Sequence, residues 1–151
     1  MPRFELATLI KAPVEVVFDI SLSVETHTSS MRASRERAVA GVTSGRLALG
    51  DQVTWEARHF GLPWRLTSTI SALDRPYSFV DEQVAGPFRR WHHAHYFEAS
   101  GEGTLMRDTV EFEAPFGPLG RLAELLVLRR YMVKLIMLRN QHIKRITEEC
   151  P

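Results

Sequence analysis

Two consecutive runs of alternating residues constrain the fold of this chain more than any other feature. In Pro87–Glu98, every second residue from Trp91 to Phe97 is an aromatic or an imidazole side chain. This alternation is typical of a strand with one buried face. The next residues, Ser100–Gly103, have the composition of a turn, and a second alternating run continues to Glu113. The two runs together predict a β-hairpin.

The predicted hairpin has one register that puts both apolar faces on the same side, with Ala99 opposite Thr104. The facing pairs on that side are Phe97 with Met106, His95 with Asp108, His93 with Val110, and Trp91 with Phe112. Aromatic side chains therefore lie at both ends of this face, with two imidazoles and a carboxylate between them. We expect the rest of the chain to close a cavity over the face.

Five further segments have strand patterns and are separated by short turns, which favours an antiparallel sheet of seven strands. The additional predicted strands are Arg3–Lys11, Ala33–Ala40, Asp51–Phe60, Trp64–Leu73 and Tyr77–Val84. Between the first two, Pro13–Ile20 and Ser23–Met31 predict two short helices. Ser23 is the N-cap candidate of the second helix.

After the breaker Ala114–Pro118, the sequence from Leu119 to about Glu148 predicts one long helix. Thirty residues of helix extend roughly 45 Å, enough to cross a whole sheet. Arg129 and Asn140 lie on its broad apolar face. The apolar residues predicted on that face are Leu122, Leu125, Leu126, Met132, Val133, Ile136, Met137 and Ile143.

The length of 151 residues fits a single domain, 1–151, and the net charge of +1 does not favour nucleic-acid binding. No apolar run is long enough to span a bilayer and no signal peptide is recognisable, so we expect a cytoplasmic protein. The only cysteine is Cys150. This excludes an internal disulfide and a thiolate metal site.

Three segments carry a resemblance to a known superfamily: APVEVVF (12–18), DEQVAGPFRRWHHAHYF (81–97) and GEGTLMRDTVEFEAPFGPLG (101–120). With this order of elements, the chain resembles the START-like, Bet v 1-like (SRPBCC) superfamily, in its bacterial polyketide cyclase/dehydrase-type branch. The resemblance implies an α+β helix-grip fold, with the sheet curved around the C-terminal helix and a cavity between them. It implies no metal and no cofactor. The superfamily contains both lipid carriers and aromatase/cyclases, so fold does not decide activity.

His95 and Asp108 are the candidate catalytic residues because they face each other in the predicted hairpin. An aspartate that orients an imidazole favours proton transfer. The alternative is a buried polar pair that only stabilises the sheet register.

A metal site is a further alternative, since His93 and His95 are two residues apart on one face. Asp108 or Asp81 would complete a set of two histidines and one carboxylate. Because the resemblance implies no metal and the neighbours are aromatic, we assign no metal site from the sequence.

The inward faces of the predicted sheet and helix supply candidate ligand-binding residues. Their polar members either anchor the oxygens of a ligand or form structural ion pairs, such as Arg129 with Asp81. Their aromatic members either stack on a ligand or belong to the core. The predicted ligand-binding residues are Trp55, His59, Trp64, Phe79, Asp81, Gln83, Trp91, His93, His95, Phe97, Asp108, Val110, Phe112, Arg129, Val133 and Ile136.

Three functions follow as hypotheses. The first is binding of a small hydrophobic or aromatic molecule in the cavity. The second is a cyclase or dehydratase that uses His95 and Asp108 for proton transfer. The third is a protein-partner module with a vestigial cavity, docking through Ala114–Leu119 or through a second apolar stripe of the helix. That stripe, Leu128, Leu135 and Ile146, is also compatible with a homodimer.

Overall fold

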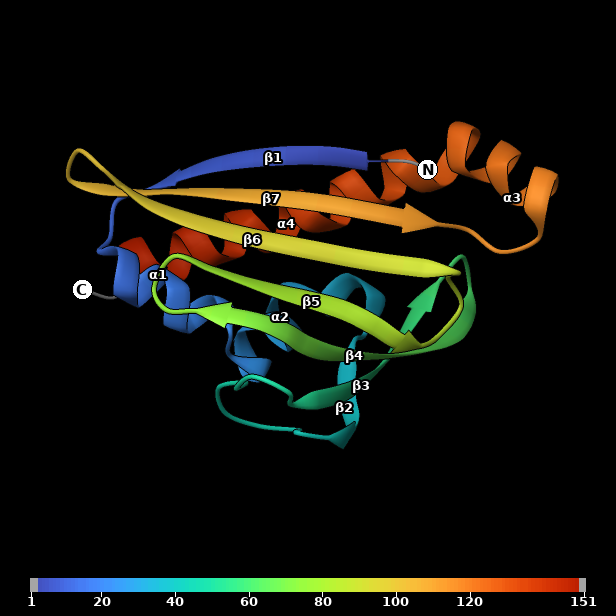
Figure 1. Ribbon diagram of the computed structural model, residues 1–151, viewed down its shortest axis with the longest axis horizontal. Helices are drawn as coiled ribbons and strands as arrows, with labels where there is room; N and C mark the ends of the chain where they lie inside the picture. Colours follow the sequence, from blue (N-terminus) through green and yellow to red (C-terminus); the bar gives the residue numbers. More distant parts are fainter. Residues whose placement is uncertain (1–2, 150–151) are drawn as a thin grey trace.

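The computed structural model describes residues 3–149 and forms one antiparallel sheet in the order β1-β7-β6-β5-β4-β3-β2 (Figure 1). The predicted number of seven strands is confirmed. Their bounds are β1 Arg3–Ile10, β2 Arg37–Gly41, β3 Gln52–His59, β4 Leu62–Asp74, β5 Ser78–Ala85, β6 Arg90–Ser100 and β7 Gly103–Glu113. Cys150 lies outside the described residues.

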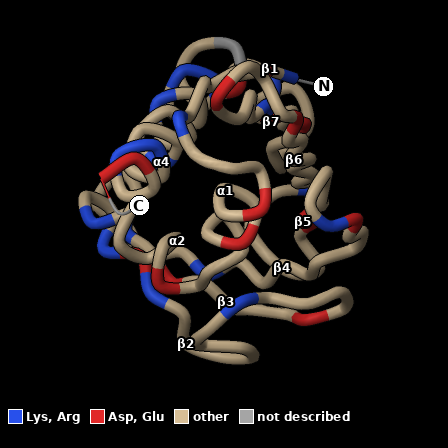
Figure 2. The backbone as a smooth tube through the Cα atoms, turned by 90° about the vertical axis from the view of Figure 1, so that its left-hand side faces the viewer, with Lys and Arg blue, Asp and Glu red and all other residues tan. Residues whose placement is uncertain are grey.

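The sheet is strongly curved, as the end-on view in Figure 2 shows. It bends from β1 through β7, β6 and β5 round to β2, and the C-terminal helix α4 (Arg129–Glu149) lies on the open side of the bend. Two short helices, α1 (Val14–Ser21) and α2 (Val24–Ser30), lie inside the bend of the sheet, on the same side of it as α4. The inner face of the sheet therefore meets helices from two parts of the chain.

The β6–β7 hairpin has the predicted register. His95 pairs with Asp108, Ala99 pairs with Thr104, and the remaining inward pairs also agree. Ser100 pairs with Gly103, so the turn has two residues where the sequence predicted four. Gly101, at φ +58°, takes the left-handed backbone conformation in this turn.

Two strand boundaries differ from the predictions for local backbone reasons. β2 begins at Arg37 and not at Ala33, because a 3₁₀ turn, η1 (Arg32–Ser34), precedes it. β4 begins at Leu62, since the turn before it is formed by Phe60 and Gly61, both at positive φ. Leu62 and Pro63, which lie between the predicted strands Asp51–Phe60 and Trp64–Leu73, therefore belong to β4, while Gly61 is in the turn.

The N-terminal helices have the predicted local signals. Pro13 precedes the first residue of α1. The Ser23 hydroxyl accepts a hydrogen bond from the Thr26 backbone N–H at 3.2 Å and caps α2.

The C-terminal segment is continuous but not uniform. It consists of α3 (Gly117–Ala123), a π-helical turn, η2 (Glu124–Leu128), and α4. None of these helices, within the part of the chain that the structure describes, has both the length and the apolar character needed to cross a bilayer.

The predicted apolar face of this helix is only partly correct. Met132, Ile136 and Ile143 are buried, whereas Leu122, Leu126 and Met137 are exposed. The π-helical turn adds a residue to the helical repeat and so rotates the α3 side chains relative to those of α4. The side chain of Leu125, also predicted on this face, lies outside those described.

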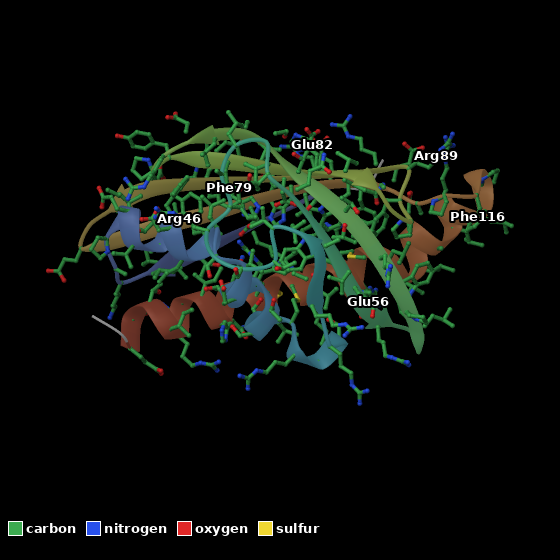
Figure 3. The ribbon with its side chains drawn as sticks, turned by 90° about the horizontal axis from the view of Figure 1, so that it is seen from below. Arg46, Glu56, Phe79, Glu82, Arg89 and Phe116 are labelled. Carbon is green, nitrogen blue, oxygen red and sulfur yellow. The ribbon has the colours of Figure 1, made fainter. Side chains whose placement is uncertain are left out.

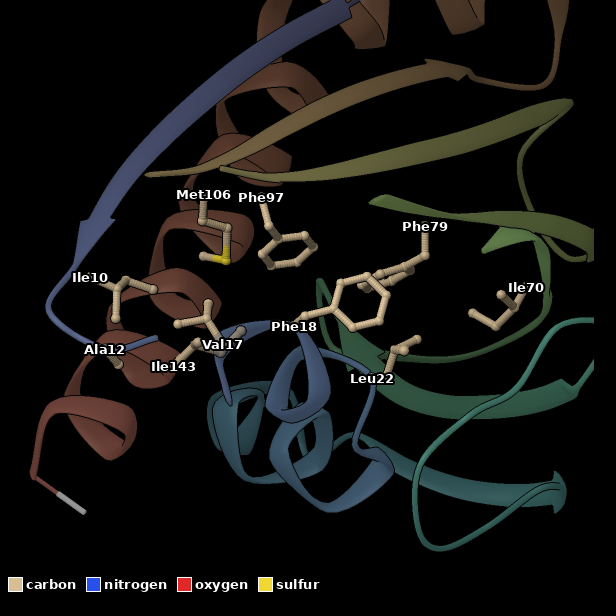
Figure 4. Close-up of a cluster of buried hydrophobic side chains, with 10 residues drawn as sticks. All are labelled: Ile10, Ala12, Val17, Phe18, Leu22, Ile70, Phe79, Phe97, Met106 and Ile143. Atoms are coloured by element: carbon tan, nitrogen blue, oxygen red, sulfur yellow. The ribbon is translucent and has the colours of Figure 1, made fainter. Parts of the chain in front are cut away.

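A tightly packed cluster joins α1, the sheet and α4 (Figure 4). Phe18 of α1 is fully buried, and its ring meets those of Phe79 and Phe97 edge-on at centroid distances of 5.6 and 5.2 Å. Ile143 of α4 belongs to the same cluster. This packing closes one end of the space under the sheet.

Replacing Phe18 by alanine is expected to lower the free energy of unfolding by about 3–5 kcal/mol, because the substitution leaves a cavity in this cluster. Urea denaturation measures the loss. Val16→Ala is the matched control on the same helix, where the side chain is exposed, and should change stability by less than about 0.5 kcal/mol. Equal losses in the two variants would contradict the assigned position of Phe18.

Candidate functional site

A cavity of about 650 Å³ lies between the curved sheet and the helices. Its walls are mostly apolar, and polar groups occur at a few places. Figure 3 shows Phe79 within the curve of the sheet, while Phe116 lies at the end of the molecule that α3 forms. Phe60, Trp64, Phe116 and Leu119 line the cavity and are also exposed, which places its opening at this end.

Nine of the residues predicted to bind a ligand line this cavity. They are Trp55, His59, Trp64, Phe79, Asp81, Trp91, His93, His95 and Ile136. Three others, Phe97, Val110 and Phe112, belong to the packed core. Asp108 is fully buried behind the histidines.

Gln83 does not line the cavity, contrary to the prediction. Its side-chain amide donates a hydrogen bond to the Phe88 carbonyl at 2.7 Å and accepts one from the Phe88 N–H at 3.2 Å. The side chain therefore stabilises the loop between β5 and β6. Alternation along the strand gave no sign of this local bond.

The prediction that Arg129 of the C-terminal helix lines the cavity was wrong, because this side chain is exposed. Val133, also predicted to line the cavity, packs against a core cluster outside the cavity lining. The buried seam of α4 includes Met132 and Ile136 and reaches Arg139, which is 3% exposed and lines the cavity. Arg139, and not Arg129, is thus the arginine of this helix that faces the cavity, and it forms its ion pair with Asp108.

The second apolar stripe of the helix is not a free surface either. Leu128 and Leu135 line the cavity and are half-buried. Ile146, the third residue of this stripe, is also half-buried.

The Asp108 carboxylate is the centre of a buried polar cluster. It accepts hydrogen bonds from His93 Nε2 and Asn140 Nδ2, both at 2.7 Å, and from Arg139 Nη1 at 3.5 Å. His95 Nδ1 lies 3.3 Å from Asp108 Oδ1. Arg139 Nη1 also donates to Asn140 Oδ1 at 2.9 Å. Strands β6 and β7 and helix α4 therefore meet at one carboxylate.

The protonation of this cluster follows from its contacts. Burial raises the pKa of Asp108, but the hydrogen bond from His93 and the nearby charge of Arg139 outweigh it and hold the pKa well below its usual value. Burial and the neighbouring His95 lower the pKa of His93 to about 4. His93 is therefore neutral near pH 7. Because Asp108 accepts from His93 Nε2, the single ring proton is on Nε2, and Nδ1 is an acceptor.

Asp81 of β5 faces the same histidines from the neighbouring strand. His95 Nε2 donates to Asp81 Oδ2 at 2.7 Å, and His93 Nδ1 lies 3.9 Å from the same oxygen. Burial opposes the charge of Asp81, yet the hydrogen bond from His95 lowers its pKa overall. Between residues 3 and 149, no hydrogen-bond partner contacts His93 Nδ1. This nitrogen is thus open to the cavity that His93 lines.

The cavity wall contains two further polar pairs that the sequence analysis did not predict. His59 Nδ1 is 2.6 Å from the Tyr131 hydroxyl, and burial lowers the pKa of His59. His27 Nε2 donates to Glu36 Oε1 at 2.6 Å. Only His59 was predicted to face inward. The other residues come from helices and loops, where no alternation marks an inward face.

The polar groups thus form one deep cluster and two pairs in an apolar wall. Rigid strands and a packed helix hold the deep cluster, so its donors and acceptors are preorganised for a polar group of a bound molecule. An imidazole with one nitrogen on a buried carboxylate and the other facing the cavity can also transfer a proton.

Comparisons with known proteins agree with this architecture. The family model described as "Polyketide cyclase / dehydrase and lipid transport" matches residues 1–148. Among curated proteins, none matches the chain.

Solved structures resemble the chain over nearly its whole length. Protein TTHA0849 of Thermus thermophilus has a TM-score of 0.75 at 21% identity, covering 94% of this chain and 97% of its own. Major latex-like protein 151 of Panax ginseng has a TM-score of 0.71 at 16% identity, covering 99% of this chain and 98% of its own. A START superfamily protein of Mycobacterium smegmatis has 0.73 at 12%, covering 99% of each. The similarity concerns the fold, and the predicted helix-grip fold is confirmed.

Asp108→Asn is expected to lower the free energy of unfolding by about 3–5 kcal/mol, because Arg139 and two imidazoles lose a buried anionic partner. Thermal and urea unfolding measure this loss.

Glu111→Gln is the control on the outer face of the same strand. Its partner Arg90 is 3.6 Å away, and both side chains of this pair are at least partly exposed. We expect a change within about 1 kcal/mol there. If Asp108→Asn were as mild as this control, Asp108 would not be the centre of the cluster.

Proposed function

The chain belongs to the polyketide cyclase/dehydrase and lipid transport family, and from this premise we propose that it binds a small, largely apolar molecule of lipid-like or polyketide-like character. The observation that carries the proposal is the apolar cavity of about 650 Å³ with a buried polar cluster in its wall. Its volume lies in the range of roughly 300–1,000 Å³ that is usual for small-molecule sites.

The apolar wall favours a flat or conjugated ligand. Trp55, Phe79 and Trp91 contribute aromatic faces and edges to the lining. Aromatic rings of a ligand would stack on such side chains or meet them edge-on. At the opening, Phe60 and Trp64 are exposed and would contact the ligand as it enters.

The polar cluster favours a ligand with a hydroxyl or phenol group at its inner end. His93 Nδ1 and the Asp81 carboxylate are acceptors at this point of the cavity. A ligand hydroxyl would donate to either acceptor. A purely apolar ligand would leave His93 Nδ1 without a partner, at a cost of about 1–3 kcal/mol.

Proton transfer is a second candidate function, and one observation favours it. The short hydrogen bond of Asp108 goes to His93 and not to His95, which the sequence had paired with Asp108 for this role. His93 therefore has the Asp–His–cavity arrangement of a general base. In a cyclase or dehydratase reaction, its Nδ1 would accept a proton from a bound substrate.

Native mass spectrometry of protein purified from its own host tests the binding proposal. We expect one small organic molecule per chain. Ala57→Phe should purify empty, because Ala57 lies in the cavity wall and the added ring occupies ligand space. Arg58→Phe is the matched control, since Arg58 is the next residue of the same strand, and its side chain is exposed and does not line the cavity.

The same pair of variants distinguishes cavity binding from surface binding. A fluorescent apolar probe should lose about tenfold or more in affinity for Ala57→Phe, which corresponds to about 1.4 kcal/mol. Equal occupancy and equal probe affinity in both variants would refute binding inside the cavity.

The proton-transfer hypothesis makes a different prediction. The extracted molecule, added back to the protein in D₂O, should incorporate deuterium at an acidic C–H position, and mass spectrometry would detect the gain. His93→Gln should abolish incorporation while the molecule still binds. Unchanged exchange in this variant would exclude His93 as the base.

A further inference from the structure

We propose that Asp81, His93 and His95 form a binding site for one divalent transition-metal ion, open to the cavity. The three residues supply two imidazole nitrogens and one carboxylate oxygen, and these atoms lie within 4.8 Å of one another. This inference concerns the metal alone and does not depend on the apolar ligand.

The distances from the Asp81 carboxylate to the two histidine nitrogens are close to those found around a bound ion. Asp81 Oδ2 is 2.7 Å from His95 Nε2 and 3.9 Å from His93 Nδ1. Around an ion with bonds of about 2.0–2.2 Å, neighbouring ligand atoms lie roughly 3–3.5 Å apart. The first distance must lengthen and the second must shorten, each by less than about 1 Å.

The outer contacts of the histidines are the strongest support. Asp108 Oδ1 lies 2.7 Å from His93 Nε2 and 3.3 Å from His95 Nδ1. In each ring this is the nitrogen remote from Asp81. Metal-binding histidines usually hold their second nitrogen on a carboxylate, which fixes ring orientation and tautomer. Here a single buried carboxylate faces both rings.

The protonation changes balance without an added reactant. His93 already carries its proton on Nε2 and has Nδ1 free to bind the ion. In His95, the proton now on Nε2 moves to Nδ1, where it is donated to Asp108. The Arg139 hydrogen bond to His95 Nδ1, at 3.5 Å, is lost, and Arg139 retains its contacts with Asp108 and Asn140.

Charge also favours a cation at this position. The carboxylates of Asp81 and Asp108 both lie within ion-pair distance of the two histidines, and Arg139 supplies one positive charge in contact with Asp108. The cluster therefore has a net negative charge when both imidazoles are neutral. Among the described residues, Arg139 is the only lysine or arginine within ion-pair distance of either carboxylate.

The scaffold places the three residues side by side. His93 is the register partner of Asp81 across β5 and β6, and His95 follows two residues later on the same face. The two imidazole rings are stacked at 3.7 Å with 24° between their planes, so each ring turns about its side-chain bonds when both bind one ion. Two nitrogens and one oxygen, with further positions open to the cavity, suit Zn²⁺, Co²⁺ or Fe²⁺.

Titration of the metal-stripped full chain with Co²⁺ tests the site. We expect one equivalent to bind and to produce visible d–d absorption bands that Zn²⁺ removes by competition. His93→Ala and Asp81→Asn should each abolish stoichiometric binding. His92→Ala is the matched control, because His92 lies on the opposite face of the same strand, near Glu82.

A fourth variant tests the outer carboxylate. Asp108→Asn should weaken Co²⁺ binding by about 10–100-fold, as expected when the carboxylate behind a metal-binding histidine is lost. Far-UV circular dichroism confirms that each variant is folded. If His93→Ala or Asp108→Asn does not fold, Asp81→Asn decides, since Asp81 is partly exposed to the cavity.

The proposal is overturned if the wild-type chain binds no stoichiometric Co²⁺, or if binding persists in Asp81→Asn. It is also overturned if His92→Ala abolishes the absorption bands, because the ion would then be on the outer surface. Affinity for a fluorescent apolar probe, measured on the same metal-free samples, reports on the ligand cavity separately. Failure of one proposal is thus distinguishable from failure of the other.

Discussion

The burial of the Asp108 carboxylate is the constraint on which the rest of the interior depends. A buried anion is stable only where donors surround it, and here β6 supplies the imidazole N–H of His93 while α4 supplies Arg139 and Asn140. The helix is therefore held against the sheet by directional bonds as well as by apolar packing. Removing the carboxylate would leave several buried donors without partners, so the cluster joins helix position and sheet register.

The same cluster determines what the cavity can bind. Its carboxylate faces the remote nitrogens of both histidines, so His93 Nδ1 and His95 Nε2 are directed away from Asp108 and toward Asp81. These atoms lie beside a mostly apolar space of about 650 Å³. A hydroxyl group, a transferable proton and a metal ion each use the acceptors that this orientation presents. The proposed functions thus share one structural cause.

Sequence patterns were reliable where one periodicity applied. Alternation along Pro87–Glu98 and the following strand predicted the register of the hairpin, and so brought His95 opposite Asp108. They were unreliable where tertiary contacts decided between neighbours. Gln83 lies on the predicted strand but bonds locally to Phe88. On α4, Arg139 is buried and Arg129 is exposed, because the contacts of the helix with the sheet decide which arginine faces inward.

By itself, the sequence determined the order of elements, the strand faces and the pairing of the hairpin, because these depend on side-chain alternation and on turns between neighbouring segments. Only the tertiary structure decided which nitrogen of each histidine faces the cavity, and that His93 makes the short bond to Asp108. Those choices depend on the distance between β5, β7 and α4, segments remote in sequence. The curvature of the sheet and the packing of the helix set that distance.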